Sequence, residues 1–309
     1  MGTFDLVVVG DANPDVLIAG APAVPAYGQT ETLVRAGTLA LGGSAAIVAH
    51  GAARLGLATA LVSVVGRDSA GSFVLDTLAS AGVDVSRVTR HDEEPTALTV
   101  CLGGPDGDRA ILTATGALAS FDPRELPRAR HVHAASYFLQ PRLAGRLTGL
   151  FRDARDLGAT TSLDTNHDPS GRWNLAPGLL GACDYALPNE SEALALSRTG
   201  SVAQAMAALA GSGTTPVVKR GRDGAVALTE GGVVTARSHP VDPVDTVGAG
   251  DSFDAGFLAG LLDGGDLTRA LALGCACGAL STGAAGGTAA QPAWEQALAF
   301  ARQGHEEGR

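Results

Sequence analysis

The sequence predicts an α/β protein with a doubly wound, mostly parallel sheet, helices on both faces and a small β-sheet lid. The first observation is that short apolar runs alternate with helix-like stretches through most of the chain, as in repeated βαβ units. The second is that two segments interrupt this alternation with patterns typical of half-exposed strands. Because 45% of the 309 residues are apolar, a large core can form, and we expect a single domain over residues 1–309.

The elements of the main sheet follow from these runs in chain order. Glycines stand where three of the helices should stop, at Gly56, Gly82 and Gly158. The expected strands are Leu6–Val9, Ala58–Val65, Val132–Ala135, Thr160–Leu163, Tyr185–Leu187 and Pro216–Val218. The expected helices are Ser44–Leu55, Ala70–Ala81, Arg142–Leu157, Ser191–Ser197 and Val202–Ala210, and two long helices, Asp251–Leu262 and Leu267 to about Thr282, should close the chain.

The two interrupting segments, about residues 12–41 and 94–119, are predicted to form the lid. Residues Gln29–Ala40 alternate polar and apolar side chains, and Thr96–Leu102 and Ala110–Thr115 flank a strong hairpin turn signal at Gly103–Asp108. A sheet with one face not covered by helices is well placed to close over a cleft. An edge extension of the main sheet is the alternative, because periodicity alone does not exclude it.

Composition restricts the partners of the protein. A net charge of −10 argues against a surface for nucleic acid or anionic membranes. No apolar run approaches the roughly 18 residues of a membrane span, and the N-terminus has no basic region of the signal-peptide kind, so we expect a cytoplasmic protein without membrane association. The four cysteines are scattered apart from the pair Cys275 and Cys277, which favours buried free thiols over a zinc site.

A glycine-rich turn that leads into a helix is the most informative motif. Within Asp245–Asp254, the residues Gly248, Ala249 and Gly250 would present unpaired backbone N–H groups at the positive end of a helix, which is an anion-binding arrangement. Asp251 follows in the first turn, where a carboxylate can take a proton from a hydroxyl that attacks a bound phosphate. The alternative is a glycine-rich loop that ends at a helix-capping aspartate.

Two rival motifs do not match. A P-loop needs Gly-Lys-Ser/Thr, whereas the only lysine of the chain, Lys219, is followed by Arg220. A nucleophile elbow around Ser252 would end in glycine, but the chain has Asp254 there, so a serine hydrolase is poorly supported. Lys219 is interpreted as a strand residue and is assigned no catalytic role.

The sequence resembles the ribokinase-like carbohydrate kinases, the PfkB family, along nearly its whole length. The segments that carry the resemblance are Gly10–Asp15, Gly42–Gly43 with Ala53–Gly56, Gly66–Gly71 with Ala81–Val83, Pro188–Glu192, Val218–Gly224 and Asp245–Asp251. The last of these is quite specific. The resemblance implies a ribokinase-like fold and the ATP-dependent phosphorylation of a hydroxyl on a small sugar or sugar-like substrate.

By this resemblance, Asp251 would be the base and Gly248–Gly250 the anion hole for the γ-phosphoryl group of ATP. Asn189 and Glu192 would organise Mg²⁺ through water molecules, although their spacing also predicts a helix-capping box. The other positions implied for the nucleotide are Gly221, Gly224, Thr246 and Cys275, and those for a monovalent cation such as K⁺ are Asp245 and Val247.

The positions that the resemblance assigns to the substrate are Asn13, Asp15, Gly42, Gly43, Ile47 and Gln140. A carboxylate and an amide suit a vicinal diol. The chain departs from the family pattern at Ile47, where many relatives carry an asparagine that contacts a substrate hydroxyl. This change puts ribose in doubt and suggests a deoxy sugar or a substrate with an apolar group nearby. Asp164 and Asn166 are left open between a contact to ligand and the shaping of a loop.

Three functions remain open at this point. A sugar or sugar-acid kinase leads; a nucleoside kinase of the same fold would suit the apolar Ile47, although few aromatic residues are available for base stacking. A catalytically weak sugar sensor is a third, and the intact Asp251 argues against it. We also expect a homodimer through the lid, because its apolar residues, such as Leu33 and Val100, would otherwise face water.

Overall fold

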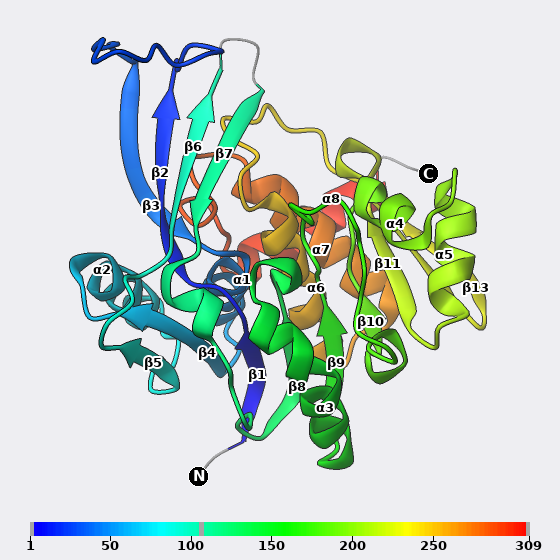
Figure 1. The fold of residues 1–309 in the computed structure, drawn as a ribbon. Coiled ribbons are helices and arrows are strands. Elements are labelled where there is room, and N and C mark those ends of the chain that lie inside the picture. Colours follow the sequence, from blue (N-terminus) through cyan, green and yellow to red (C-terminus); the bar gives the residue numbers. More distant parts are fainter. Residues whose placement is uncertain (1–2, 105–107, 307–309) are drawn as a thin grey trace.

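A nine-stranded sheet forms the centre of the protein in the computed structural model, which describes residues 3–104 and 108–306 (Figure 1). Its strand order is β13-β12-β11-β10-β9-β8-β1-β4-β5. These strands are β1 (Phe4–Val9), β4 (Thr59–Gly66), β5 (Val88–His91), β8 (Ala129–Ala134), β9 (Thr160–Leu163), β10 (Tyr185–Ala186), β11 (Thr215–Lys219), β12 (Ala225–Thr229) and β13 (Gly232–Ala236). Neighbours from β11 to β5 pair in parallel, and β12 and β13 add an antiparallel edge, so the predicted doubly wound sheet is confirmed.

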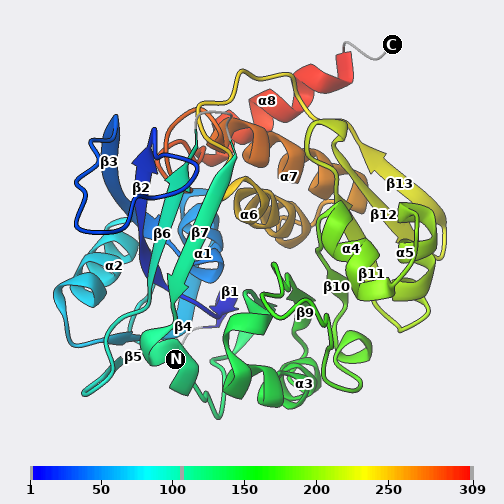
Figure 2. The same cartoon turned by 45° about the horizontal axis from the view of Figure 1, so that its top comes forward.

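Helices cover both faces of this sheet because successive side chains of a strand point to opposite sides. In β1, Leu6 and Val8 belong to one buried cluster and Val7 and Val9 to another. The first cluster is covered by α1 (Ser44–Arg54), α2 (Ser69–Ser80), α6 (Ala249–Leu262), α7 (Leu267–Ser281) and α8 (Trp294–Glu306). The opposite face is covered by α3 (Pro141–Asp156), α4 (Glu190–Ser197) and α5 (Val202–Ala210), as Figure 2 shows.

The lid is a separate four-stranded sheet that projects from the edge of the main body (Figure 1). It consists of β2 (Asn13–Ala19), β3 (Ala36–Gly42), β6 (Leu98–Gly103) and β7 (Arg109–Ala114), in the order β3-β2-β6-β7. The two separate sheets exclude an edge extension of the main sheet. Part of the predicted turn between β6 and β7, at residues 105–107, lies outside the described residues.

The prediction was wrong in three places. The strand expected over Gln29–Ala40 begins only at Ala36, and β2, which was not predicted, precedes it. The edge strands β5 and β13 were missed, because half-exposed strands carry little of the apolar signal that marks a central strand. The apolar strand β12, which lies between β13 and β11, was also missed. The chain also ends with a third helix, α8, after the two predicted ones. The three helix-ending glycines are confirmed, since Gly56, Gly82 and Gly158 have φ values of 92°, 90° and 88°.

Glycines set the position of α6, the helix that begins at the predicted anion site. A Cβ on Gly256 would lie 2.7 Å from the Cys277 Sγ of α7, and one on Gly274 would lie 2.8 Å from the Phe253 ring. The two helices therefore pack closely only because these residues have no side chain. Among the described residues, no helix combines the length and the apolarity that a membrane crossing requires.

Candidate active site

A cavity of about 890 Å³ opens at the N-terminus of α6. It has the size expected for a small-molecule site. The predicted residues that line it are Asn189, Glu192, Gly221, Gly224, Thr246, Gly248, Ala249, Gly250, Asp251 and Cys275. The structure thus brings together residues from four distant parts of the sequence that were assigned to the anion hole, the nucleotide and the magnesium ion.

The turn at the start of α6 has the backbone geometry of an anion site. Gly248 is the N-cap, with a left-handed φ of 71°, and a Cβ there would lie 2.5 Å from the Gly287 Cα. Only glycine suits this position. Ala249 and Gly250 form the first turn, where the N–H groups have no acceptor within the helix and the helix dipole favours negative charge.

Asp251 lies beside this turn with 7% of its surface exposed. Burial raises the pKa of its carboxyl to about 7, helped by the negative charges of Asp164 and Asp11, while the Lys219 ammonium and a hydrogen bond with Ser44 act in the opposite direction. A carboxylate with a pKa near neutrality is well matched to accept a proton from a hydroxyl at physiological pH.

Lys219 is a strand residue, as predicted, at the end of β11, and its side chain also borders the site. It lines the cavity, and its Nζ lies 2.6 Å from the Asp164 Oδ2 and 3.1 Å from the Asp254 Oδ1. Burial lowers the pKa of Lys219, but the Asp164 and Asp254 charges outweigh it, so the pKa is raised and the ammonium stays charged. The sequence feature that could have indicated this cluster is the lysine itself, because a lysine in a buried apolar strand needs an acidic partner.

Asn189 and Glu192 form the capping box of α4 and also face the cavity. The Asn189 Oδ1 accepts the Glu192 N–H, and the Glu192 Oε2 accepts the Asn189 N–H, both at 2.9 Å. Burial, together with the Asp164 charge, raises the pKa of Glu192 to about 7. The Lys219 ammonium partly offsets this rise, and a buried carboxylate that uses one oxygen for the cap fits a hydrated magnesium ion.

The predicted sugar residues gather where the lid meets the main sheet. The Asn13 Nδ2 donates to the Asp15 Oδ1 at 2.9 Å and to the Thr99 Oγ1 at 3.2 Å. Burial raises the pKa of Asp15 to about 7, with a further contribution from the Asp11 charge. Gly42 is opposite Asn13 in the lid register, and its missing side chain makes room for the Asp15 carboxylate.

The three remaining substrate positions have different surroundings from Asn13 and Asp15. The Ile47 side chain is 3% exposed and packs against Gly287. A Cβ added to Gly287 would lie 2.7 Å from the Ile47 Cδ1. Gln140 is fully buried, and its Nε2 donates to the carbonyls of Ala135 and Ser136 at 3.0 Å. Like the other five predicted substrate positions, Gln140 is not among the residues that line the cavity. Gly43 is the N-cap of α1, with φ 84°.

Asn166, left open by the sequence, joins the loop after β9 to α1. Its left-handed φ of 54° is unusual for a side chain other than glycine. The Asn166 Oδ1 accepts the Ser136 N–H at 2.7 Å, and its Nδ2 donates to the Ser44 Oγ at 2.9 Å. Asn166 and Asp164 also line the cavity, so both shape the loop and border the site.

The lid reaches the anion loop through Arg109 of β7. Its guanidinium donates to the Thr246 Oγ1 at 2.8 Å and lies 3.4 Å from the Asp245 Oδ1. The same Asp245 oxygen accepts the Val247 N–H, and the Oδ2 accepts the Gly286 N–H at 2.9 Å. Arg109 could not be recognised from the sequence, because no local pattern connects a lid strand to a loop 136 residues further on.

Comparison with known proteins places this geometry among sugar kinases. The model of the pfkB family carbohydrate kinases matches residues 3–294. The ATP-dependent ribose-1-phosphate kinase of Halopiger xanaduensis is 34% identical over 269 residues, which cover 85% of this chain and 87% of the relative. The 2-dehydro-3-deoxygluconokinase of Bacillus subtilis is 33% identical over 285 residues, covering 84% and 86%. The structure of Arabidopsis thaliana ribokinase complexed with ribose and ATP superposes with a TM-score of 0.87 and 25% identity, covering 97% of this chain and 99% of that one.

Proposed function

Because the chain belongs to the pfkB family of carbohydrate kinases and is a sugar kinase, we propose that it transfers the γ-phosphoryl group of ATP to a hydroxyl of a small sugar or sugar acid, with Asp251 as the base. The observation that carries this proposal is the buried Asp251 carboxylate beside the glycine turn of α6, in a cavity of about 890 Å³. Few other reactions need an anion site and a proton acceptor so close together.

The residues divide the work of phosphoryl transfer. Asp251 takes the proton of the attacking hydroxyl. The N–H groups of Gly248–Gly250 donate hydrogen bonds to the transferring phosphoryl group and so stabilise its negative charge. Gly221, Gly224 and Cys275 border the nucleotide in the same cavity. Asn189 and Glu192 would hold magnesium, which when bound supplies positive charge to the phosphates.

The sugar side favours a substrate that combines hydroxyls with an apolar edge. Asp15 and Asn13 offer hydrogen bonds to a diol, whereas Ile47 can neither donate nor accept one. The name of the Bacillus subtilis relative specifies a deoxy sugar acid, which agrees with this chemistry, and the Halopiger xanaduensis relative is named for a sugar phosphate. We therefore place deoxy sugar acids first among the candidate substrates.

The test is ADP release from ATP and magnesium across pentoses, pentose 1-phosphates, hexoses, keto-deoxy sugar acids and nucleosides. We expect one sugar class to turn over and nucleosides to react poorly, because few aromatic side chains are available to stack on a base. If a nucleoside is turned over faster than any sugar, the protein is a nucleoside kinase and the sugar-kinase proposal is wrong. Bound ligand without ADP release across the panel would favour the sensor.

The monovalent cation expected beside Asp245 and Val247 has a competitor in the Arg109 guanidinium. Both Asp245 oxygens already accept backbone N–H groups, and Arg109 supplies a positive charge at 3.4 Å. The residues therefore fit a potassium ion poorly. We expect turnover to change less than about twofold when potassium is replaced by tetramethylammonium at equal ionic strength.

In a variant without this guanidinium, we expect turnover to depend on potassium. In Arg109→Ala the Asp245 carboxylate loses its cation, and we expect potassium to stimulate turnover roughly fivefold, which corresponds to about 1 kcal/mol for a partly exposed charge pair. Arg35→Ala, which removes an exposed arginine just before β3, is the matched control and should stay insensitive. Strong stimulation of the unaltered protein by potassium would contradict this assignment.

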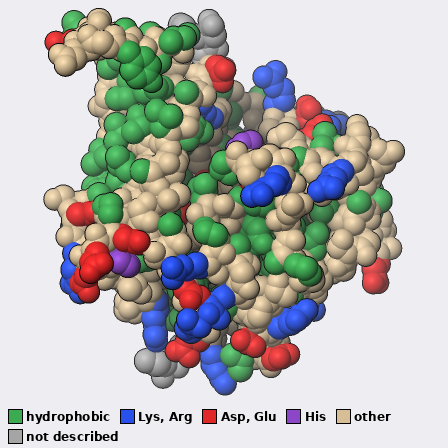
Figure 3. Space-filling model, viewed as in Figure 1, with side chains coloured by type: hydrophobic (Ala, Val, Ile, Leu, Met, Phe, Trp, Pro, Cys, Tyr) green, Lys and Arg blue, Asp and Glu red, His purple; other side chains and the backbone are tan. Residues whose placement is uncertain are grey.

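The face of the lid turned away from Asp15 and Thr99 is apolar, which supports a homodimer. Paired residues of neighbouring strands share a face, so Leu39, Val16, Val100 and Leu112 form one row across all four strands. Leu39 and Leu112 are 53% and 59% exposed, and hydrophobic side chains spread over the lid in Figure 3. Leu33, singled out from the sequence, is 89% exposed.

We expect light scattering at micromolar concentration to give the mass of two chains. Leu112→Lys should shift the protein toward the monomer, because a charge at the β7 end of this row cannot be buried without a partner. Val233→Lys, on the exposed edge strand β13, is the matched control and should leave the mass unchanged. A clean monomer for the unaltered chain would remove the dimer from the proposal.

A further inference from the structure

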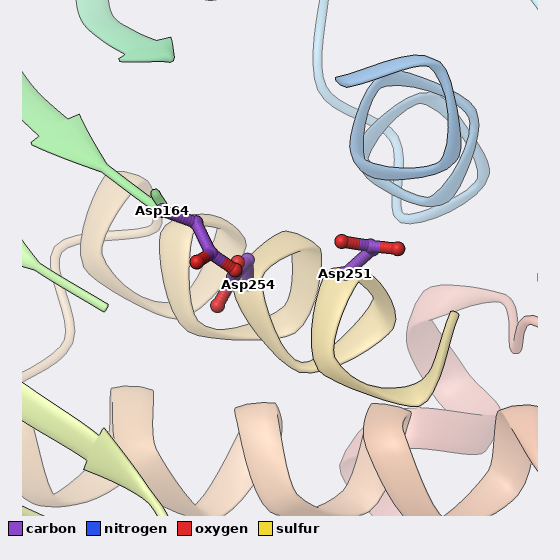
Figure 4. A group of neighbouring side chains, drawn as sticks. All are labelled: Asp164, Asp251 and Asp254. Atoms are coloured by element: carbon purple, nitrogen blue, oxygen red, sulfur yellow. The ribbon is translucent and has the colours of Figure 1, made fainter. Parts of the chain in front are cut away.

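Three buried carboxylates lie close together in the wall of the cavity, and one ammonium contacts two of them. The carboxylates of Asp164, Asp251 and Asp254 each have an oxygen within 4.8 Å of the others. Figure 4 shows Asp164 beside Asp254, with Asp251 further along the same helix as Asp254. Such a cluster can hold a metal ion, but here the Lys219 Nζ lies within hydrogen-bonding distance of Asp164 and Asp254. The cation of this cluster is therefore the lysine side chain.

Proton positions within the cluster follow from its hydrogen bonds. Burial raises the pKa of Asp254 well above its ordinary value, whereas the Lys219 charge and the hydrogen bonds of Asp164 together outweigh burial and lower the pKa of Asp164. Asp164 is therefore the member of the cluster that holds a negative charge most readily. The Lys219 ammonium opposes the effect of this charge on Asp251.

Lys219 also lies against the anion hole. Its Nζ would be 3.5 Å from a Cβ placed on Gly250, the residue that precedes Asp251 in the first turn of α6. Two anchors of different origin hold it there, Asp164 at the end of β9 and Asp254 one turn further along α6. The ammonium is therefore fixed beside the first turn of α6, next to the proposed phosphate site.

Resting on the proposed function, we propose that Lys219 is a positioning residue of the phosphoryl-transfer site, which balances the Asp164 charge and so keeps the Asp251 carboxylate ionised beside the anion hole. Without its ammonium, the uncompensated Asp164 would push Asp251 to hold its proton, and a protonated Asp251 cannot accept one from the substrate.

The surroundings of Asp251 explain why one lysine has this influence. Asp164, from the loop after β9, and Asp11, after β1, face Asp251 with negative charge, and Asp254 shares its helix. Ser44 of α1 contributes a hydroxyl. Within the described part of the chain, Lys219 is the cation that acts on Asp251.

The test is the pH dependence of kcat/KM for the substrate found in the panel. The unaltered enzyme should gain activity as the pH rises through about 7, where Asp251 loses its proton. In Lys219→Met we expect this rise to move upward by about one to two pH units, so that activity at pH 7 falls about five- to fiftyfold while at least about half of the activity at pH 9 is retained. Lys219→Arg keeps the charge, and its rise should stay at the pH of the unaltered enzyme even if its rate is lower.

The double variant Lys219→Met with Asp164→Asn removes both charges and should return the rise to within about half a pH unit of the unaltered enzyme. It also tests the proposal if Lys219→Met alone fails to fold. Arg269→Met removes a cation that pairs with Asp263 at the far end of α6, and should not move the profile. Equal loss of activity at every pH in Lys219→Met, or a double variant displaced upward by a full unit, would overturn the role of Lys219. Absence of turnover in the unaltered enzyme would instead overturn the proposed function.

Discussion

Replacement of Asp251 by asparagine should lower kcat about a thousandfold, within the 10²–10⁴-fold range of general base catalysis. The substitution conserves volume in a site that is 7% exposed, so the fold and the cavity should persist. It removes the atom that accepts the proton, and the glycine turn of α6 and the residues that border the nucleotide remain in place. The measurement is ADP release at about pH 8, where the carboxylate of the unaltered enzyme is ionised.

The control for this variant is Asp263→Asn, at the half-exposed C-terminal end of the same helix. Its kcat should equal that of the unaltered enzyme. Nucleotide affinity should be similar in all three proteins, because Asp251 acts on the attacking hydroxyl. A loss of less than tenfold in kcat for Asp251→Asn, with the protein folded, would exclude Asp251 as the base.

Gly42→Ala should selectively damage the sugar side of the site. A Cβ at this position would lie 1.9 Å from the Asp15 Oδ1, so the carboxylate must leave its place beside Asn13. A hydrogen bond to a charged group contributes about 1.5–3 kcal/mol, and we expect kcat/KM for the sugar to fall roughly 10–100-fold. The affinity for ATP should be unchanged, since neither Gly42 nor Asp15 is among the residues that line the cavity at the start of α6.

Gly37→Ala is the matched control on the same strand. The added methyl there would meet only the Ile18 Cδ1, at an ordinary distance of 3.6 Å. Kinetics for sugar and ATP should match the unaltered enzyme, and thermal stability should change little in either variant. Equal losses in Gly42→Ala and Gly37→Ala would indicate a general effect on the lid and would remove Asp15 from the substrate site.

The sequence by itself determined the α/β architecture and the chemical centre of this protein. Both depend on residues that are close together in the chain. The alternation of apolar strands and helices predicts the parallel sheet, and Gly248–Asp251 predicts a helix N-terminus with a carboxylate beside it. The helix α8 and the strands β5, β12 and β13 were not predicted. The capping box at Asn189 and Glu192 was also predictable, because its partners are three residues apart.

The electrostatic environment of the site could be known only from the tertiary structure. Lys219 meets Asp164 and Asp254 across 55 and 35 residues of sequence, and Arg109 reaches Thr246 across 137. The pKa of Asp251 depends on burial and on charges that three different strands bring to it. Backbone conformation is dictated largely by neighbours in the chain, whereas Coulomb interactions and desolvation depend on distances that exist only after the chain has folded. The same separation explains why the sequence indicates a base at Asp251 but assigns no role to the lysine beside it.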